Sequence, residues 1–265
     1  MNEFKAAAAN RPFEGKMFLY EQPELLTRAD HGGLGLSAVA RPFDFVRTVR
    51  AVPLVSLEFS SAQKDYPVVF SDTDIPTPLA VLGVVDDVNL FVDESGNWAR
   101  SHYVPSYIRC HPIAFATGPN EQLAVVIDRA ATTIVDQPDE PFFDGEKLTD
   151  KMQKRVDFCA RYNLERGKTK AFCSRLKELG LFTGQQVIHQ PHGGREQRPV
   201  GTYVAIDVEK VGKLDNDTLR ELHDDGSLAA IYAHVFSLEN WSRLLDLRME
   251  RLVAKAAEID QNPKL

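Results

Sequence analysis

"PIAFATGPNEQLAVVID", residues 112–128, consists of two apolar runs on either side of a Gly-Pro turn. Two such runs around turn residues are typical of antiparallel strands joined in a β-hairpin. Five more short apolar runs precede it, separated by prolines or short polar stretches: residues 52–59, 67–70, 78–85, 88–93 and 98–104. The last two flank a Ser-Gly-Asn turn, which predicts another hairpin. The first half of the chain therefore predicts short strands joined by tight turns, and hence an antiparallel sheet.

The second half of the chain has mostly helical patterns. Apolar residues recur at helical spacing from Thr149 to Gly180, where Gly167 predicts a bend or break and Gly180 predicts the end of the helix. A third hairpin is predicted around residues 191–196. Three further helices are then predicted: residues 215–226, residues 227–236 and a last one from Ser237 onward. The middle one is apolar nearly all round, which predicts burial, and the last carries an apolar face between Trp241 and Val253.

The whole pattern predicts an α+β fold, in which an antiparallel sheet of hairpin-connected strands is covered by helices. We expect a flexible arm over residues 1–16 and one compact domain over residues 17–258. Residues 128–146 are acidic, contain prolines and lack a period, which predicts a long loop that either wraps the surface or marks a boundary. With 43% hydrophobic and 26% charged residues, the 265-residue chain has the composition of an ordinary globular protein.

Charge, cysteine content and the absence of targeting patterns bear on the partners and the compartment of the protein. A formal net charge of −7 argues against nucleic-acid binding, which requires a basic face. The best basic group, between Arg161 and Lys170, is equally well explained as a solvated helix face. The three cysteines lack a CxxC spacing, which favours buried thiols in a reducing compartment. Because the sequence has neither a signal-peptide pattern nor a run of about twenty apolar residues, we expect a cytoplasmic protein that does not insert into a membrane.

Two stretches have residue types that bind metals or cofactors. His102, Cys110 and His111 are zinc-binding types, but Pro105 and Pro112 predict a short helix between them that points Cys110 and His111 in different directions. Residues 33–38 match G-x-G-x-x-A, yet no strand precedes them, as a dinucleotide site requires. We therefore predict no metal site and no cofactor.

Arg109 is the best candidate for ligand recognition. If the short helix packs through Tyr103 and Tyr107, Arg109 projects from a rigid element and can bind a carboxylate or phosphate. It can equally form a structural ion pair with Asp93 or Asp128, so both interpretations stay open.

Three titratable residues are candidates for catalysis. Asp128 ends a predicted strand, where a carboxylate can be catalytic but is also common as a turn residue. His234 lies within an apolar helix, where a hydrogen-bonded core histidine is the usual alternative to a ligand. His31 precedes the glycine-rich stretch. These three residues and Arg109 would form one pocket if the protein were an enzyme.

The chain resembles the SapC family of bacterial proteins across about residues 17–245. The resemblance rests on ten stretches in family order: "VPLVSLEF", "YPVVF", "LAVLGV", "NLFVDESGNW", "YVPSYIRCHPIAF", "LAVVID", "FFDGE", "AFCSRLKELGLF", the hairpin between Gln185 and Asp207, and "LHDDGSLAAIYAHVFSLEN". It implies that five residues belong to the family pattern: Tyr103, Pro105, Tyr107, Arg109 and Pro112. Cys110 and His111 depart from that pattern, and Gly33 and Gly35 are not part of it, which weakens the metal and dinucleotide interpretations further.

The resemblance implies no particular reaction. The family name indicates a surface layer, and the neighbourhood of relatives beside TonB-dependent receptors implies an accessory role in nutrient uptake. We therefore predict a non-catalytic binding or accessory protein that docks a protein or peptide partner, with Arg109, Tyr103, Tyr107 and Asp93 in recognition. The alternative is an enzyme acting on a peptide or modified amino acid in a pocket of Arg109, Asp128, His31 and His234. A homodimer through the last helix is a third, purely structural use of the chain.

Overall fold

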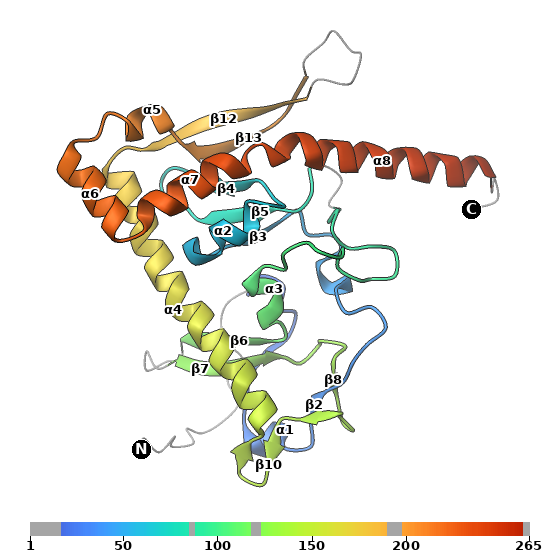
Figure 1. The fold of residues 1–265 in the computed structure, drawn as a ribbon. Helices are drawn as coiled ribbons and strands as arrows, with labels where there is room; N and C mark the ends of the chain where they lie inside the picture. Colours follow the sequence, from blue (N-terminus) through green and yellow to red (C-terminus); the bar gives the residue numbers. More distant parts are fainter. Residues whose placement is uncertain (1–16, 85–87, 118–122, 190–197, 262–265) are drawn as a thin grey trace. The chain divides into compact units, whose positions relative to one another are not determined.

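The computed structural model describes residues 17–84, 88–117, 123–189 and 198–261 of the chain (Figure 1). They form two compact units, each built from two separate stretches of sequence. The first unit contains the residues up to Val39 and Cys110–Ala160, and the second contains Ala40–Arg109 and Arg161–Leu265. The predicted arm over residues 1–16 and the turns of two predicted hairpins, residues 118–121 and 191–196, lie outside the described residues. The domain limits at 17 and 258 stay a prediction.

The first unit is built from short antiparallel strands. One sheet has the order β1-β7-β6, a second has the order β8-β2-β9, and β10 pairs with β11. The elements are β1 (Pro23–Leu25), α1 (Arg28–His31), β2 (Gly35–Leu36), β6 (Ile113–Thr117), β7 (Leu123–Asp128), β8 (Ile134–Val135), β9 (Glu140–Pro141), β10 (Phe143–Asp144) and β11 (Lys147–Leu148). β6 and β7 pair with Ile113 opposite Ile127, and both side chains are buried. The antiparallel pairing predicted for residues 112–128 is therefore confirmed.

The predicted long loop over residues 128–146 is wrong, because this segment contains β8, β9 and β10. Strands of two residues are too short to show a period in the sequence. β2 lies between β8 and β9, with Gly35 opposite Val135 and Pro141. A Cβ at Gly35 would lie 2.3 Å from the Glu140 carbonyl oxygen, so glycine is required here for a close approach of two strands.

The second unit is built around a five-stranded sheet of order β12-β13-β4-β5-β3 (Figure 1). All its pairs are antiparallel, so the predicted α+β fold with hairpin-connected antiparallel strands is confirmed. The strands and short helical turns are η1 (Asp44–Val46), β3 (Ala51–Pro53), η2 (Ser56–Glu58), α2 (Phe59–Ala62), β4 (Val68–Phe70), β5 (Pro78–Val81), α3 (Ser106–Cys110), β12 (Phe182–His189), β13 (Arg198–Ile206) and α5 (Val208–Val211). The predicted hairpin over residues 88–104 is reduced to one bridge between Val92 and Trp98.

Four longer helices complete the chain: α4 (Asp150–Glu178), α6 (Asn216–Asp224), α7 (Ser227–Ser237) and α8 (Asn240–Gln261). α4 is continuous through Gly167, so the predicted break is wrong, since one glycine costs a helix only about 1 kcal/mol. It ends as predicted, with Gly180 at φ +66° and the Leu181 amide donating to the Leu176 carbonyl at 3.1 Å.

The predicted burial of the helix over residues 227–236 is wrong in part. α7 buries Ile231 and His234 against β4 and β13, but Tyr232 is 39% exposed and Phe236 is 61% exposed. The apolar face of α8 is buried at Leu244 but open at Val253, which is 65% exposed. An apolar pattern shows that a residue can be buried, and the number of neighbouring elements decides whether it is. The predicted start of the last helix at Ser237 also differs, since Ser237 ends α7 and α8 begins at Asn240.

Candidate functional site

A polar cluster in the second unit holds the start of α3. The Glu58 carboxylate is buried, and its Oε1 accepts hydrogen bonds from the Ser106 amide at 2.6 Å and from the Tyr103 hydroxyl at 2.7 Å. Its Oε2 accepts from the Val55 amide at 3.1 Å. A carboxylate at a helix N-terminus satisfies amides that the helix itself leaves unbonded. Glu58 therefore joins the end of η2 to the start of α3.

Arg109 extends this cluster toward solvent. One Nη of Arg109 donates to the Tyr103 hydroxyl at 3.1 Å and to the Ser106 hydroxyl at 2.8 Å, and the guanidinium lies 5.5 Å from the centre of the Tyr103 ring. Burial raises the pKa of Tyr103, and the negative charge of Glu58 raises it further, so Tyr103 stays a neutral donor. The exposed Arg109 is thus held in place on its own short helix.

The other two predicted recognition residues have local contacts in the second unit. The half-buried Tyr107 packs against Tyr162, with ring centres 6.0 Å apart. Asp93 is exposed in a turn, where its carboxylate accepts from the Asn97 amide at 2.9 Å. Tyr107 therefore contributes packing, and Asp93 shapes the turn.

His234 is a core residue of the second unit. It is 0% exposed, its Nε2 accepts from the Ile206 amide at 3.0 Å, and its Nδ1 lies 2.7 Å from the Val68 carbonyl oxygen. These two contacts assign the proton to Nδ1. Burial lowers the pKa of His234 to about 4, which keeps the ring neutral. Both nitrogens are therefore used to join β13 to β4.

Asp128 and His111 form a buried pair in the first unit. Asp128 accepts from the amides of Glu21 and Gln22 at 3.1 and 2.8 Å, and one of its oxygens lies 3.3 Å from His111 Nε2. The Tyr20 ring packs against His111 with ring centres 5.3 Å apart. Burial lowers the pKa of His111, against the opposing effect of the Asp128 charge. The Asp128 carboxylate thereby fixes the segment that leads into β1.

His31 is also buried in the first unit. Its Nε2 lies 3.1 Å from the Glu24 carboxylate, and its Nδ1 lies 3.2 Å from the Thr27 amide nitrogen. The four residues of the predicted enzyme pocket are thus divided between the units, with His31 and Asp128 in the first and Arg109 and His234 in the second. Three of them are at most 2% exposed and bind main-chain groups.

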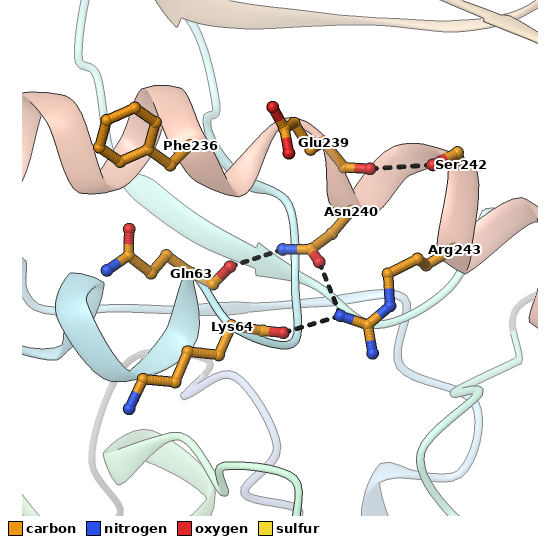
Figure 2. Close-up of a pocket in the computed structure, with 7 residues that line it drawn as sticks. All are labelled: Gln63, Lys64, Phe236, Glu239, Asn240, Ser242 and Arg243. Carbon is orange, nitrogen blue, oxygen red and sulfur yellow. Dashed lines mark hydrogen bonds between the residues drawn. The ribbon is translucent and has the colours of Figure 1, made fainter.

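An open hollow of about 610 Å³ lies on the second unit, between the turn that follows α2 and the start of α8 (Figure 2). Seven residues line it: Gln63, Lys64, Phe236, Glu239, Asn240, Ser242 and Arg243. The buried Asn240 side chain donates to the carbonyls of Gln63 at 2.7 Å and Tyr66 at 3.2 Å, which fixes one wall. Arg243 donates to the Lys64 carbonyl at 3.0 Å and to Asn240 Oδ1 at 3.3 Å. Hydrogen bonds from the Asn240 and Arg243 side chains to main-chain carbonyls therefore fix the shape of the hollow.

The rim of the hollow combines aromatic and cationic side chains. Phe236 lies beside Tyr232, with ring centres 6.2 Å apart at 29°, and both rings are exposed. The side chains of Lys64 and Arg243 extend on the opposite side of Asn240 from the Glu239 carboxylate (Figure 2). Sequence reasoning missed this surface, because the hydrogen bonds that form it join residues 177 and 179 positions apart. It missed the role of Glu58 for the same reason, since Glu58 and Ser106 are 48 positions apart. The only sequence feature that pointed to this surface was the pair of aromatic residues, Tyr232 and Phe236, in the apolar segment that forms α7.

Other kinds of site find no support in the described residues. Within residues 17–84, 88–117, 123–189 and 198–261, no three His, Cys, Asp or Glu side chains are placed to share a metal ion. The three cysteines, all in described parts of the chain, are buried and form no disulfide. Burial raises the pKa of Cys173 to about 12, so its thiol stays protonated. Each helix in the same ranges is too short or too polar to cross a bilayer.

Comparison with known protein families shows a match over most of the chain. The SapC family model matches residues 26–244, which is most of the chain. No curated protein and no solved structure is significantly similar to it. The match includes Glu58, Arg109, Asp128 and His234 as well as the residues that line the hollow.

Proposed function

The chain belongs to the SapC family, and we propose that this member is a non-catalytic protein that binds an acidic peptide segment of a partner protein. The observation that carries the proposal is the hollow at the start of α8, whose lining includes an exposed aromatic ring, Phe236, two cationic side chains, Lys64 and Arg243, and one carboxylate, Glu239. Recognition surfaces of this kind combine an aromatic anchor with charged groups that select the partner.

The chemistry of the rim specifies the ligand. Carboxylates of a partner would pair with Lys64 and Arg243, and an apolar side chain would pack on Phe236. Because Arg243 is already held by the Lys64 carbonyl and by Asn240, less side-chain entropy is lost when a ligand binds. Two cations, Lys64 and Arg243, face one carboxylate, Glu239, in the lining of the hollow, so on a chain of net charge −7 this place favours acidic segments over the rest of the surface.

Catalysis has less support. A catalytic group must reach the substrate by a hydrogen bond or through one water molecule. His31, Asp128 and His234 are almost fully buried, and their polar atoms bind main-chain groups within their own units. The alternative of an enzyme acting on a peptide or modified amino acid would require these contacts to break.

Arg109 is proposed as a second recognition residue, together with Tyr103, Tyr107 and Asp93. It is exposed, and Tyr103 and Ser106 hold its guanidinium. An Arg109→Ala protein that folds and still binds its partner with unchanged affinity would remove Arg109 from this account. The resemblance to the family adds a proposed accessory role, in the cytoplasm, beside surface-layer or TonB-dependent uptake systems.

The test uses two fluorescent peptides of one length, one with alternating Asp and Phe and one with Lys in place of Asp. Fluorescence anisotropy at low and high salt should show that the acidic peptide binds and the basic one does not, with affinity falling as salt rises. Arg243→Glu should weaken binding about tenfold or more, because a like charge then faces the peptide. Phe236→Ser should weaken it as well.

Matched controls lie elsewhere on the chain. Lys170→Glu changes an exposed cation of α4, and Leu57→Ser removes an apolar side chain that is 70% exposed. Neither should alter binding. Equal binding of the two peptides, or an Arg243→Glu protein with full affinity, would refute the proposal.

A further inference from the structure

β12 is an edge strand with few protections against pairing. It is the first strand in the order of the five-stranded sheet, so β13 is its neighbour on one side only. Its eight residues, FTGQQVIH, contain no proline and no Asp, Glu, Lys or Arg. Residues 184–186 are exposed, and a Cβ added at Gly184 would meet nothing within 4 Å. Edge strands usually avoid association through charges, prolines or very short length, and this strand has none of these.

The direction of the main-chain groups follows from neighbouring hydrogen bonds. The Asp207 amide donates to the Leu181 carbonyl at 2.8 Å, whereas the Ile206 amide donates to His234 and so points away from β12. In an antiparallel pair, hydrogen-bonded and non-bonded residues alternate. Odd-numbered residues of β12 up to Val187 therefore face β13, and even-numbered residues face away.

Lys210 supports this assignment and limits the open edge. Its Nζ lies 3.4 Å from the Phe182 carbonyl oxygen, on the side away from β13. At the other end the ladder shifts between Val187 and Ile188. Between these limits, the N–H and C=O groups of Gly184 and Gln186 face outward, and no strand among the described residues pairs with them.

We propose that this edge pairs with β12 of a second copy of the chain, antiparallel, about a two-fold axis at Gln185. Gly184 of each copy then lies opposite Gln186 of the other, and their amides and carbonyls form four hydrogen bonds. Gln185 faces its own counterpart in a non-hydrogen-bonded pair. The main-chain groups of residues 184–186 are thus complementary to themselves.

The charge and symmetry of the strand favour a second copy over a foreign segment. A two-fold axis brings the central side chain against itself, which is unfavourable for a charged residue and harmless for Gln185. The outward main-chain groups, those of Gly184 and Gln186, also lie symmetrically on either side of Gln185. A foreign strand would find a glycine and two glutamines, which offer no pocket to select its sequence. This surface shares no residue with the hollow at the start of α8 or with the predicted seam along that helix, so each proposal can fail alone.

Disulfide trapping of a Gln185→Cys protein tests the pairing. Facing residues in a non-hydrogen-bonded antiparallel pair have Cα atoms about 4.5 Å apart, within reach of a disulfide. Mild oxidation should therefore give a covalent dimer on a non-reducing gel, which a thiol reductant reverses. The native cysteines are buried and should give little background. Thr202→Cys, an exposed position on β13 opposite Gln186, is the matched control and should stay monomeric.

A second substitution separates pairing from random collision. Proline in place of Gln186 removes an outward amide without removing a β12–β13 hydrogen bond. The double variant Gln185→Cys, Gln186→Pro should form the dimer about tenfold less, because two of four hydrogen bonds are lost. Circular dichroism melting checks that the variant is folded. A yield from Gln185→Cys no higher than from Thr202→Cys, or a yield that the proline leaves unchanged in a folded variant, overturns the proposal.

Discussion

Replacing His234 by glutamine tests how α7 is attached to the sheet. Val204 lies opposite Phe70, so the same register places Ile206 opposite Val68. His234 joins these two residues where a direct hydrogen bond between the strands would otherwise form. Its role requires a neutral ring, because Nε2 must accept a hydrogen bond while Nδ1 donates one. Protonation should therefore break the contact with Ile206 and weaken the folded state.

The size of the effect follows from the pKa of His234. Its ordinary value is 6.5, and burial lowers it to about 4 in the folded protein. The folded state therefore binds fewer protons than the unfolded state between these values, so the stability that this group contributes is full above pH 6.5. It is lost as the pH falls through 6.5 toward 4. A difference of about 2.5 units at about 1.4 kcal/mol each gives about 3.4 kcal/mol in total, of which about 2 kcal/mol is lost by pH 5.

Urea unfolding at pH 7 and pH 5 measures this loss in three proteins. In the His234→Gln protein the introduced side-chain amide can donate to the Val68 carbonyl and accept from the Ile206 amide, but it does not titrate. We expect its loss of unfolding free energy between the two pH values to be about 2 kcal/mol smaller than in the wild type. His223→Gln is the control, because the His223 side chain is 76% exposed, and it should behave as the wild type. An equal loss in His234→Gln and wild type would refute the reasoning.

Three further predictions concern the other buried polar groups. Glu58→Ala should lower the free energy of unfolding by about 3 kcal/mol or more in urea titrations, because three donors lose their acceptor; a loss below about 1 kcal/mol would contradict this. Glu58→Gln should lower the pKa of Tyr103 toward its ordinary value, seen by ultraviolet titration, because the charge that raises it is removed. Asp128→Ala should speed hydrogen exchange of the amide of Gln22 by about tenfold or more, measured by mass spectrometry, and unchanged exchange would show that Asp128 does not fix this segment.

Most of the fold was predictable from the sequence, because apolar periodicity and turn residues act locally. The strands around residues 112–128, the long helix and its end at Gly180 are all fixed by neighbouring residues. The two-residue strands at 134–148 were missed, because such short pairs depend on partners distant in sequence, such as β2. The exposure of Tyr232 and Phe236 was missed for a related reason, because an apolar sequence does not show how many other elements pack around the helix.

The candidate site was less predictable, because it depends on contacts between distant segments. Arg109 was identified as a residue on a short rigid helix, and its helix was found as expected. Its link to Glu58 through Tyr103 and Ser106 has no sequence signal, since Glu58 lies about fifty residues away within an apolar run. The wall of the hollow formed by Asn240 and residues 63–66 likewise has no sequence signal, because these segments are distant in sequence.

The buried polar residues share one property that bears on function. Glu58, Asp128, His234 and Asn240 each bind two or more main-chain groups, so their hydrogen-bonding capacity is used inside the fold. Arg251 does the same for the carbonyls of residues 89, 90 and 92. Polar groups used in this way specify how segments join, and they cannot also bind a substrate without breaking those joints. The search for function should therefore concentrate on surfaces where polar groups face outward, such as the rim of the hollow, the exposed Arg109 and the open edge of β12.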